Sequence, residues 1–291
     1  MATTLTTLAE GFSYLECPRW HDGRLWVSDF YTNTVSTVDA DGAATTVATL
    51  EHQPSGLGWL PDGRLLIVSM RDRRLLRLEA DGTLAEHADL SGLASWHLND
   101  MLVDGDGRAY VGNFGFDLMS MAPMAPAELV VVEPDGAARV EARELAFPNG
   151  MALSPDGGEL IVAETLGQRL TAFTRRADGP LGARRTWAEF GPASGPDVEA
   201  WLGSGPTLAP DGIAAVGDGT IWAADALGNR VVRIAEGGEL LDEISTGDLG
   251  VYACAVGGDD GRTLFLCAAP SFSEHERRDT RDGVLLTARP D

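Results

Sequence analysis

Short apolar runs alternate with polar, turn-forming residues along the whole chain. Runs such as Leu65–Val68 and Leu129–Val132 have the length of buried strands. Many of them follow an Asp-Gly pair, which suits tight hairpin turns because aspartate and glycine tolerate positive φ. No stretch shows convincing helical periodicity. The pattern therefore predicts an all-β chain of short strands joined by tight turns.

One signature recurs along this pattern: Asp-Gly followed by a stretch rich in Leu, Val, Ile and Trp. Successive copies lie 40, 44, 50, 62 and 42 residues apart. A unit of about 40–50 residues holds four short strands, which is the size of one propeller blade. The copies begin at Asp22, Asp62, Asp106, Asp156, Asp218 and Asp260. We therefore predict a six-bladed β-propeller with four-stranded blades around a central axis, as a single domain over residues 1–291.

Three segments fall outside the regular repeat. Thr3–Leu8 alternates weakly ahead of the first unit. We expect it to form the outer strand of the last blade and close the ring, because closure removes an open sheet edge. The excess length of the third and fourth units falls in Asp117–Pro126 and Gly191–Pro206, which are rich in Pro, Gly, Ala or Met. We expect both to be loops over one face.

Charge and composition narrow the classes of partner. The chain has 22 Lys and Arg against 44 Asp and Glu, a net charge of −22. Such a field repels nucleic acid and anionic membranes and favours cations, although solubility alone would also explain it. Met1–Leu8 lacks the features of a signal peptide, and the three cysteines predict neither a disulfide framework nor a zinc knuckle. We expect a cytoplasmic protein, monomeric or weakly self-associating, that acts on a small molecule.

The repeat also aligns one position across the blades, about seven residues before each Asp-Gly aspartate. From the first blade to the sixth, this position holds Glu16, Ser55, Asn99, Asn149, Asp211 and Ala253. Innermost strands converge on the axis of a propeller, so these side chains should point at one another. Two carboxylates and two amide oxygens are hard donors that suit Ca²⁺, Mg²⁺ or Mn²⁺. Asn-Gly and Asp-Gly are otherwise ordinary turn signals, but the phase of the repeat favours a metal ring.

A second polar register lies about seven residues after each Asp-Gly aspartate. It contains Asp29, Ser69, Asn113, Glu164 and Asp225. The favoured interpretation is a hydrogen-bond network at the ends of the blades. Asn113 and Glu164 are the members that we also consider as substrate-binding residues lining a pocket.

Four stretches together resemble a known family. They are LECPRWHDGRLW at Leu15, WHLNDMLVDGDG at Trp96, FPNGMALSPDG at Phe147 and APDGIAAVGDG at Ala209. In this order and spacing the chain resembles the family of senescence marker protein (regucalcin), gluconolactonase and luciferin-regenerating enzyme over essentially its whole length. The resemblance implies a six-bladed propeller, in agreement with the repeat. It also implies that Glu16, Asn149 and Asp211 bind a metal and that Asn99 contacts the substrate.

Two residues depart from the family's pattern. Cys17 stands where a small residue usually follows the glutamate, and His97 stands where sugar lactonases of the family often have arginine. Arginine grips a polyhydroxylated or anionic substrate through several donors, whereas histidine offers fewer and can titrate. Apolar residues near these motifs also indicate a less polar substrate: Trp96, Phe114, Phe116, Met119, Met121 and Met124.

The resemblance implies a metal-dependent lactonase, a hydrolase acting on a carboxylic ester bond. We expect one divalent ion, with Ca²⁺ favoured over Mg²⁺, Mn²⁺, Zn²⁺ or Fe²⁺. Asp211 would be both ligand and general base toward the attacking water, and Asn99 would orient the ring or stabilise the oxyanion. His97 would bind substrate by donating to the leaving oxygen, or would shape the pocket.

Two other functions stay open at this point. The same metal site would suit another electrophile, such as a phosphotriester or a C=N bond. A non-catalytic propeller that binds calcium or a ligand is the other, since one fold hosts many functions. Other hydrolytic and nucleotide-binding chemistry has no support, because the chain lacks a GxSxG elbow, a P-loop and a strand followed by GxGxxG.

Overall fold

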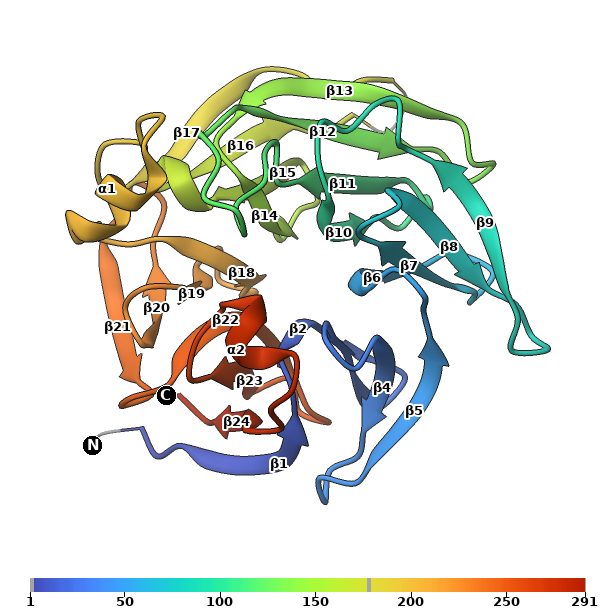
Figure 1. The fold of residues 1–291 in the computed structure, drawn as a ribbon, viewed down its shortest axis with the longest axis horizontal. Coiled ribbons are helices and arrows are strands. Elements are labelled where there is room, and N and C mark those ends of the chain that lie inside the picture. Colours follow the sequence, from blue (N-terminus) through green and yellow to red (C-terminus); the bar gives the residue numbers. More distant parts are fainter. Residues whose placement is uncertain (1–2, 177–178, 291) are drawn as a thin grey trace.

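The computed structural model describes residues 3–176 and 179–290 and shows six four-stranded antiparallel sheets arranged in a ring (Figure 1). The predicted six-bladed propeller is therefore confirmed. From the axis outward, the first blade contains β2 (Leu15–His21), β3 (Arg24–Asp29), β4 (Thr34–Val38) and β5 (Ala44–Thr49). The second contains β6 (Pro54–Trp59), β7 (Leu65–Ser69), β8 (Arg74–Leu78) and β9 (Leu84–Asp89). The third contains β10 (Leu98–Val103), β11 (Ala109–Asn113), β12 (Ala127–Val132) and β13 (Ala138–Leu145).

The remaining blades follow the same order. The fourth contains β14 (Pro148–Leu153), β15 (Glu159–Glu164), β16 (Arg169–Thr174) and β17 (Arg184–Glu189). The fifth contains β18 (Pro210–Ala215), β19 (Ile221–Asp225), β20 (Arg230–Ile234) and β21 (Leu240–Ser245). The sixth contains β22 (Gly250–Gly257), β23 (Thr263–Ala269), β24 (Gly283–Ala288) and β1 (Thr6–Phe12). Each blade is twisted, and the blades pack face to face through apolar side chains. In one such layer Leu66 and Val68 of β7 belong to the same buried cluster as Met101 of β10 and Val111 of β11.

The N-terminal strand closes the ring, as predicted, but it lies later in the chain than Thr3–Leu8. β1 pairs antiparallel with β24, with Thr6 opposite Thr287 and Phe12 opposite Gly283. Ala9 and Phe12 are buried in the cluster that contains Leu285. The strand extends to Phe12 because these two side chains complete the core of the last blade.

Every innermost strand carries a shift in its pairing with the second strand of its blade. The shifts fall at Glu16/Arg19, Pro54/Leu57, Leu98/Met101, Pro148/Met151, Pro210/Ile213 and Val251/Ala253. A bulge of this kind increases the local twist and re-aims a side chain. The axial position identified from the repeat lies at this bulge in every blade.

Glycine follows the axial residue in three blades because neighbouring inner strands approach closely. A Cβ on Gly150 would lie 2.5 Å from the carbonyl oxygen of Asp211, and one on Gly212 would lie 2.5 Å from the Cα of Ala253. Neither glycine has a positive φ, and both lie within strands. The Asn149-Gly150 and Asp211-Gly212 pairs are therefore parts of strands rather than turns.

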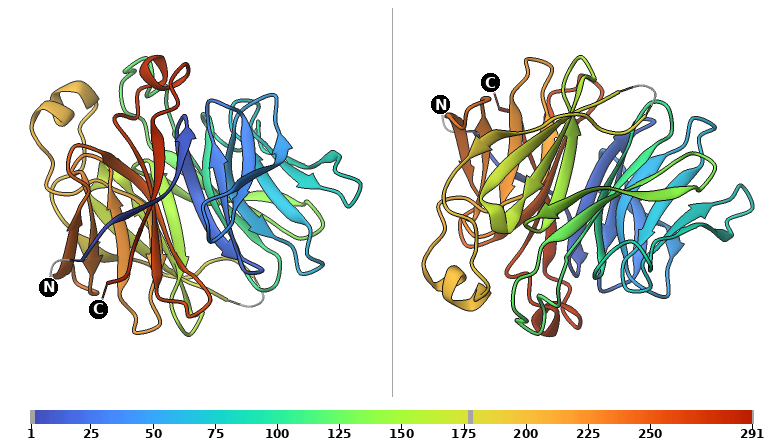
Figure 2. Two further views of the ribbon diagram at one scale, coloured as in Figure 1. Left: turned by 90° about the horizontal axis from the view of Figure 1, so that it is seen from below. Right: turned by 90° about the horizontal axis from the view of Figure 1, so that it is seen from above.

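Three insertions gather on one face of the ring (Figure 2). They are the segment 117–126, the segment 191–206 and the connection between β23 and β24. The segment 117–126 contains no helix or strand, as predicted, but the segment 191–206 contains helix α1 (Val198–Gly203). The side chain of Asp197 caps this helix by accepting from the nitrogen of Ala200 at 2.9 Å. A backbone bond from Met124 to Pro196, 3.0 Å long, joins the two segments.

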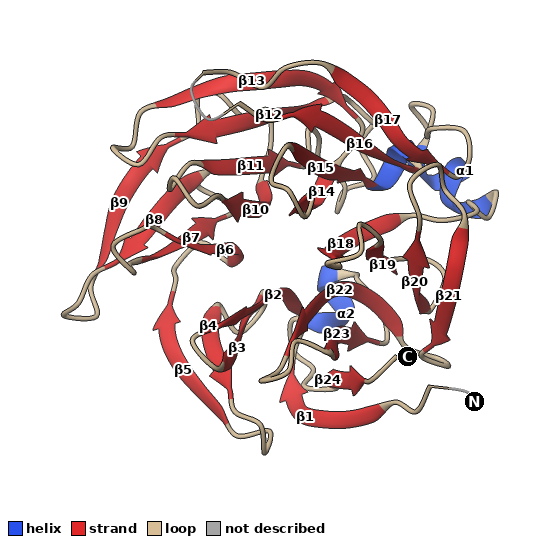
Figure 3. Cartoon of the chain, turned by 180° about the vertical axis from the view of Figure 1, so that it is seen from behind, coloured by secondary structure: helices blue, strands red, loops and turns tan. Residues whose placement is uncertain are grey.

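The few short helices among the described residues were not predicted from the sequence (Figure 3). Helix α2 (Glu274–Arg277) lies between β23 and β24, and the short 3-10 helix η1 (Thr165–Gly167) follows β15. All three are too short to produce the 3.6-residue periodicity by which helices are recognised. Within residues 3–176 and 179–290, no helix has the length and apolar content that crossing a membrane requires.

Candidate active site

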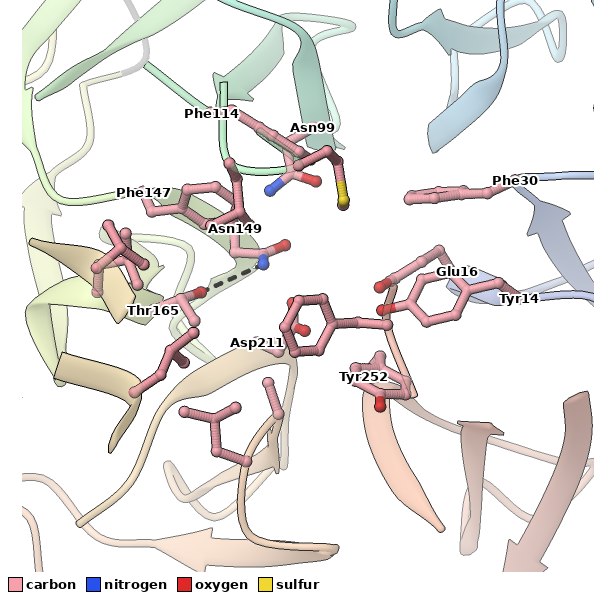
Figure 4. Close-up of a pocket in the computed structure, with 18 of the residues that line it drawn as sticks. Tyr14, Glu16, Phe30, Asn99, Phe114, Phe147, Asn149, Thr165, Asp211 and Tyr252 are labelled. Carbon is pink, nitrogen blue, oxygen red and sulfur yellow. Dashed lines mark hydrogen bonds between the residues drawn. The ribbon is translucent and has the colours of Figure 1, made fainter. Parts of the chain in front are cut away.

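Four of the six axial side chains lie at the base of one cavity. Glu16 on β2, Asn99 on β10, Asn149 on β14 and Asp211 on β18 all line it. All four are buried, and Figure 4 shows them turned toward a common centre. Together with the solvent at its mouth, the cavity encloses about 700 Å³ of empty space, and its wall includes residues of the insertions. The other two axial residues, Ser55 and Ala253, are buried but do not line it.

Both asparagine side chains are tied to the next blade around the ring, Asn99 directly and Asn149 through Thr165 of its own blade. The Nδ2 atom of Asn99 donates to the carbonyl oxygen of Pro148 at 3.3 Å. The Nδ2 atom of Asn149 donates to the hydroxyl of Thr165 at 3.2 Å, and that hydroxyl donates to the carbonyl oxygen of Pro210 at 2.8 Å. Because the nitrogen atoms are engaged with the protein, the Oδ1 atoms are left to face the cavity. No protein donor reaches either Oδ1 atom in the described part of the chain.

The two axial carboxyl groups are destabilised in their ionised form. Burial, followed by repulsion from Asp100, raises the pKa of Glu16 to about 8. Burial also raises the pKa of Asp211 well above its usual value, and repulsion from Glu16 and Asp100 adds to the effect. The Oδ1 atom of Asp211 is fully buried and has no hydrogen-bond partner among the described residues. A cation between these carboxylates would favour their ionised form and so offset both effects.

The residues present fit a hard divalent cation better than a metal that prefers nitrogen or sulfur ligands, such as Zn²⁺. The described residues contain no cluster of three or more His, Cys, Asp and Glu side chains placed to hold a metal. A cation on the axis would therefore need the amide oxygens of Asn99 or Asn149 beside the two carboxylates. Such an all-oxygen set, with one orphaned carboxylate oxygen at Asp211, suits Ca²⁺, Mg²⁺ or Mn²⁺.

A partly buried ion pair lies next to the axial ring and was not singled out from the sequence. The Nη2 atom of Arg19 lies 2.6 Å from Oδ1 of Asp100 and donates to the carbonyl oxygen of Met101 at 2.7 Å. Asp100 directly follows Asn99, so the LND stretch contained the only signal for it. Arg19 also lines the depression on the opposite face of the ring. Asp100 thus forms an ion pair with Arg19, whereas neither Glu16 nor Asp211 forms an ion pair with a described residue.

Two tyrosines beside the ring were also missed. Tyr14 and Tyr252 line the cavity, and their ring centroids are 4.8 Å apart. Burial raises the pKa of Tyr252, and the negative charges of Asp211 and Glu16 raise it further. Both hydroxyls therefore stay protonated at neutral pH. Their positions in the repeat could have revealed them, because Tyr14 lies two residues before Glu16 and Tyr252 lies one residue before Ala253.

His97 does not line the cavity. Its ring lies 5.1 Å from the ring of Trp96 and 6.3 Å from that of Phe114, between centroids. Burial, together with the positive charge of Arg71, lowers the pKa of His97. The imidazole is therefore neutral at pH 7 and reaches the cavity only through Phe114, which does line it.

Asn113 and Glu164 also lie outside the cavity wall. Asn113 accepts from the nitrogen of Gly115 and donates to the carbonyl oxygen of Glu128, both at 2.9 Å. Glu164 accepts from the nitrogen of Ala146 at 2.7 Å and from Arg169. Neither side chain is placed to touch a molecule in the cavity, because its polar atoms are engaged within its own blade.

Three members of the second polar register instead anchor the segments that lead into the inner strands. Asp29 accepts from the nitrogens of Ser13 and Tyr14, just before Glu16. Asp225 accepts from the nitrogen of Ala209 at 3.1 Å, just before Asp211. Together with the bond from Ala146 to Glu164, these contacts form the hydrogen-bond network that was the favoured interpretation of this register.

Of the apolar residues singled out near the motifs, two belong to the cavity wall. Phe114 and Met119 line it. The others pack elsewhere or remain exposed: Trp96, Phe116, Met121 and Met124. Most of the wall comes from residues that sequence analysis had no reason to connect, including Trp201 of α1 and Phe272 ahead of α2.

Comparison with protein families gives one match that spans most of the chain. Residues 15–270 match the family described as the SMP-30/Gluconolactonase/LRE-like region. A relative from Pseudomonas putida, 6-deoxy-6-sulfogluconolactonase, is 28% identical over 260 residues, which are 87% of this chain and 82% of the relative. The family match includes all four axial residues that line the cavity.

Solved structures show the same fold. A gluconolactonase from Xanthomonas campestris superposes with a TM-score of 0.74 at 24% identity, covering 99% of this chain and 89% of that one. Regucalcin from Agrobacterium tumefaciens, described as a calcium-binding protein, superposes with a TM-score of 0.79 at 20% identity, covering 100% and 96%. At these identities the likeness concerns the fold alone.

Proposed function

The chain belongs to the SMP-30/gluconolactonase/LRE-like family, and from this membership we propose that it hydrolyses a lactone with the help of one divalent metal ion, Ca²⁺ before the other hard cations. The observation that carries the proposal is the convergence of Glu16, Asn99, Asn149 and Asp211 at the base of one open cavity. A scaffold has no need for unpaired carboxylates at the base of a cavity. The names of the relatives, a sulfogluconolactonase and a gluconolactonase, support a lactone as the substrate.

Glu16, Asn149 and Asp211 are the proposed ligands of the ion. Their donor atoms come from three blades, and Thr165 holds the Asn149 amide with its oxygen toward the axis. A bound divalent cation would supply Lewis acidity, which polarises an ester carbonyl and favours deprotonation of water. The absence of histidine and thiolate donors from the ring favours Ca²⁺, Mg²⁺ or Mn²⁺ over Zn²⁺ or Fe²⁺.

Asp211 and Asn99 are the proposed catalytic residues. Asp211 accepts a proton from water as the oxygen of that water attacks the lactone carbonyl carbon. The ring C–O bond then breaks, the ring oxygen takes up the proton, and the product is a hydroxy acid. Asn99 spends one N–H on Pro148, so its second N–H is available to donate to the substrate carbonyl oxygen as negative charge develops there.

The other three residues predicted to bind substrate would act indirectly, by positioning neighbouring segments or side chains. Glu164 bonds to Ala146 and so fixes the segment that leads to Asn149. Asn113 orders the turn that follows β11, next to Phe114. His97 packs beside Phe114 and would influence which substrates fit rather than the rate of bond cleavage.

The proposal is tested with chelator-treated protein and a panel of hydroxylated and alkyl lactones, assayed with a series of added divalent ions. We expect ring opening only when an ion is restored, with Ca²⁺ among the effective ions. If the protein hydrolyses phosphotriesters but none of the lactones, the alternative hydrolase is favoured. Ion binding without turnover of any substrate would favour a binding propeller.

A further inference from the structure

The wall of the cavity above the axial residues is predominantly apolar. Apart from Glu16, Asn99, Asn149, Asp211 and Thr165, the described residues that line the cavity are aliphatic or aromatic, and their only polar side-chain groups are the hydroxyls of three tyrosines and the indole N–H of Trp201. No arginine, lysine or histidine is among these described lining residues. A substrate inside the cavity therefore meets carboxyl and amide groups at the base and mostly hydrocarbon on every other side.

The positive charges in the depression beside the cavity are engaged with other residues. Arg71 lines a neighbouring depression that shares Phe30 and Tyr31 with the cavity. Its guanidinium donates to Gln53 and to Glu274, each at 2.8 Å. Glu274 also accepts from Arg278 at 3.2 Å. An anionic group on a substrate would have to break these pairs before a cation could reach it.

The insertions that lengthen the third and fourth units of the repeat build much of this wall. The segment between β11 and β12 contributes Leu118, and helix α1 contributes Val198, Trp201 and Leu202. The wall is held in place by the Met124–Pro196 backbone bond and by the cap on α1. These contacts preorganise an apolar surface, so an apolar ligand would pay little to order it.

The base of the wall is also aromatic. Phe114 and Phe147 pack with their centroids 4.6 Å apart beside Asn99 and Asn149, as Figure 4 shows. Phe30 and Tyr14 flank Glu16 with their centroids 5.3 Å apart. A ring lying against the axial residues is therefore flanked by aromatic side chains rather than by further amide or charged groups.

We propose that the cavity takes a lactone whose ring substituent is a hydrocarbon, alkyl or aryl, in preference to a sugar lactone or a lactone that bears an anionic group. The proposal rests on the proposed function. Burying the several hydroxyls of a sugar lactone against this wall would remove them from water with few new partners, which is costly. Burying hydrocarbon is favourable, and each methylene should raise kcat/KM by about fourfold until the cavity is filled. The name of the Pseudomonas putida relative denotes a sulfonated sugar lactone, and this wall offers no cation for a sulfonate among its described residues.

The test compares glucono-δ-lactone with δ-hexalactone, δ-octalactone and δ-decalactone, which share the ring size and differ in the substituent. We expect kcat/KM to rise along the alkyl series and to exceed the value for glucono-δ-lactone by at least about tenfold at the longest chain. Equal or better turnover of glucono-δ-lactone would overturn the inference and leave the proposed function intact.

A pair of matched variants locates the effect. Leu202→Gln places an amide in the wall, and we expect it to flatten the chain-length dependence while the melting temperature changes little. Leu241→Gln is the control, because Leu241 is 49% exposed on β21 and does not line the cavity. A chain-length dependence unchanged by Leu202→Gln would show that the alkyl group lies elsewhere.

Binding of δ-decalactam, which resists hydrolysis, separates the two proposals. Calorimetric titration should show tighter binding of this lactam than of the unsubstituted δ-valerolactam, even if no lactone is turned over. Tighter binding of δ-decalactam in a protein that hydrolyses no lactone would contradict the proposed function but support the preference of the cavity for a hydrocarbon substituent. Equal or undetectable binding of both lactams would overturn the apolar cavity.

Discussion

Asn149 donates from Nδ2 to the Thr165 hydroxyl at 3.2 Å, and that contact decides which end of its amide faces the axis. Thr165 can accept this bond because its own hydrogen is donated to the carbonyl oxygen of Pro210. The chain of two bonds crosses from one blade to the next. It leaves the Oδ1 atom of Asn149 as the donor atom presented to a cation.

Removal of the Thr165 hydroxyl should weaken metal binding. Thr165→Val keeps the shape of the side chain but releases the amide of Asn149, so we expect affinity for Ca²⁺ to fall by about 10–100-fold. Thr165→Ser keeps the hydroxyl and should stay within a few-fold of the wild-type affinity. Calorimetric titration with Ca²⁺ measures both. Equal affinity for all three proteins would show that Asn149 is not a ligand.

Stability in chelator should depend on pH because of the raised pKa of Glu16. Between its usual value of 4.5 and about 8, the unfolded chain has lost this proton while the folded chain keeps it. The free energy of unfolding should therefore decrease as pH rises through this window and level off above it. The buried Asp211 carboxyl, whose pKa is also raised, acts in the same direction.

Added Ca²⁺ should reverse this trend. Because the ion competes with protons for the same carboxylates, its stabilising effect should be larger at pH 8 than at pH 5. Melting curves with chelator and with Ca²⁺ at several pH values provide the measurement. An ion effect that is absent, or that is largest at acidic pH, would contradict binding at Glu16 and Asp211.

Asp211 and Asn149 should differ in what they contribute to the rate. Asp211→Asn keeps an oxygen donor but loses the basic carboxylate, so kcat at saturating ion should fall on the order of 10²-fold or more. Asn149→Asp keeps a ligand and should retain substantial activity. The comparison requires measured ion occupancy for each variant. An Asp211→Asn protein with full occupancy and the wild-type rate would show that the base lies elsewhere.

Gly150→Ala should destabilise the fold through the contact between inner strands. Its Cβ would lie 2.5 Å from backbone atoms of β18, so the strands must move apart at a cost of about 1–3 kcal/mol. Gly92→Ala is the control, because nothing lies within 4 Å of a Cβ there and its φ is not positive. Denaturant unfolding of both variants gives the difference. Equal stability of the two would contradict the close approach.

The repeat made most of the fold predictable. The phase of the Asp-Gly signature assigned Glu16, Asn99, Asn149 and Asp211 to equivalent positions in four blades, and the fold brings them to one cavity. The prediction worked because a propeller repeats one local unit, so a residue's position within its unit determines its place relative to the axis. The start of β1 was misplaced because Thr3–Leu8 lies outside that repeat.

The remainder of the site depends on contacts between blades and insertions. Asn113 and Glu164 share a register with Asp29, but only their hydrogen bonds to Gly115 and Ala146 reveal that they hold loops instead of lining the cavity. Helix α1 begins at a local cap by Asp197, but the backbone bond from Met124 to Pro196 is what joins its segment to the other insertion. That bond joins residues far apart in the chain, so the local sequence does not specify it.

The sequence by itself determined the number of blades and the four polar residues that share the axial cavity, because both follow from the repeat, and it indicated closure by an N-terminal strand, because closure removes an open sheet edge. Only the tertiary structure decided which amide end of Asn149 faces inward, that Arg19 neutralises Asp100, and that Trp201 and Phe272 share one apolar wall. These relationships join residues far apart in the chain, and packing in three dimensions is what brings them into contact.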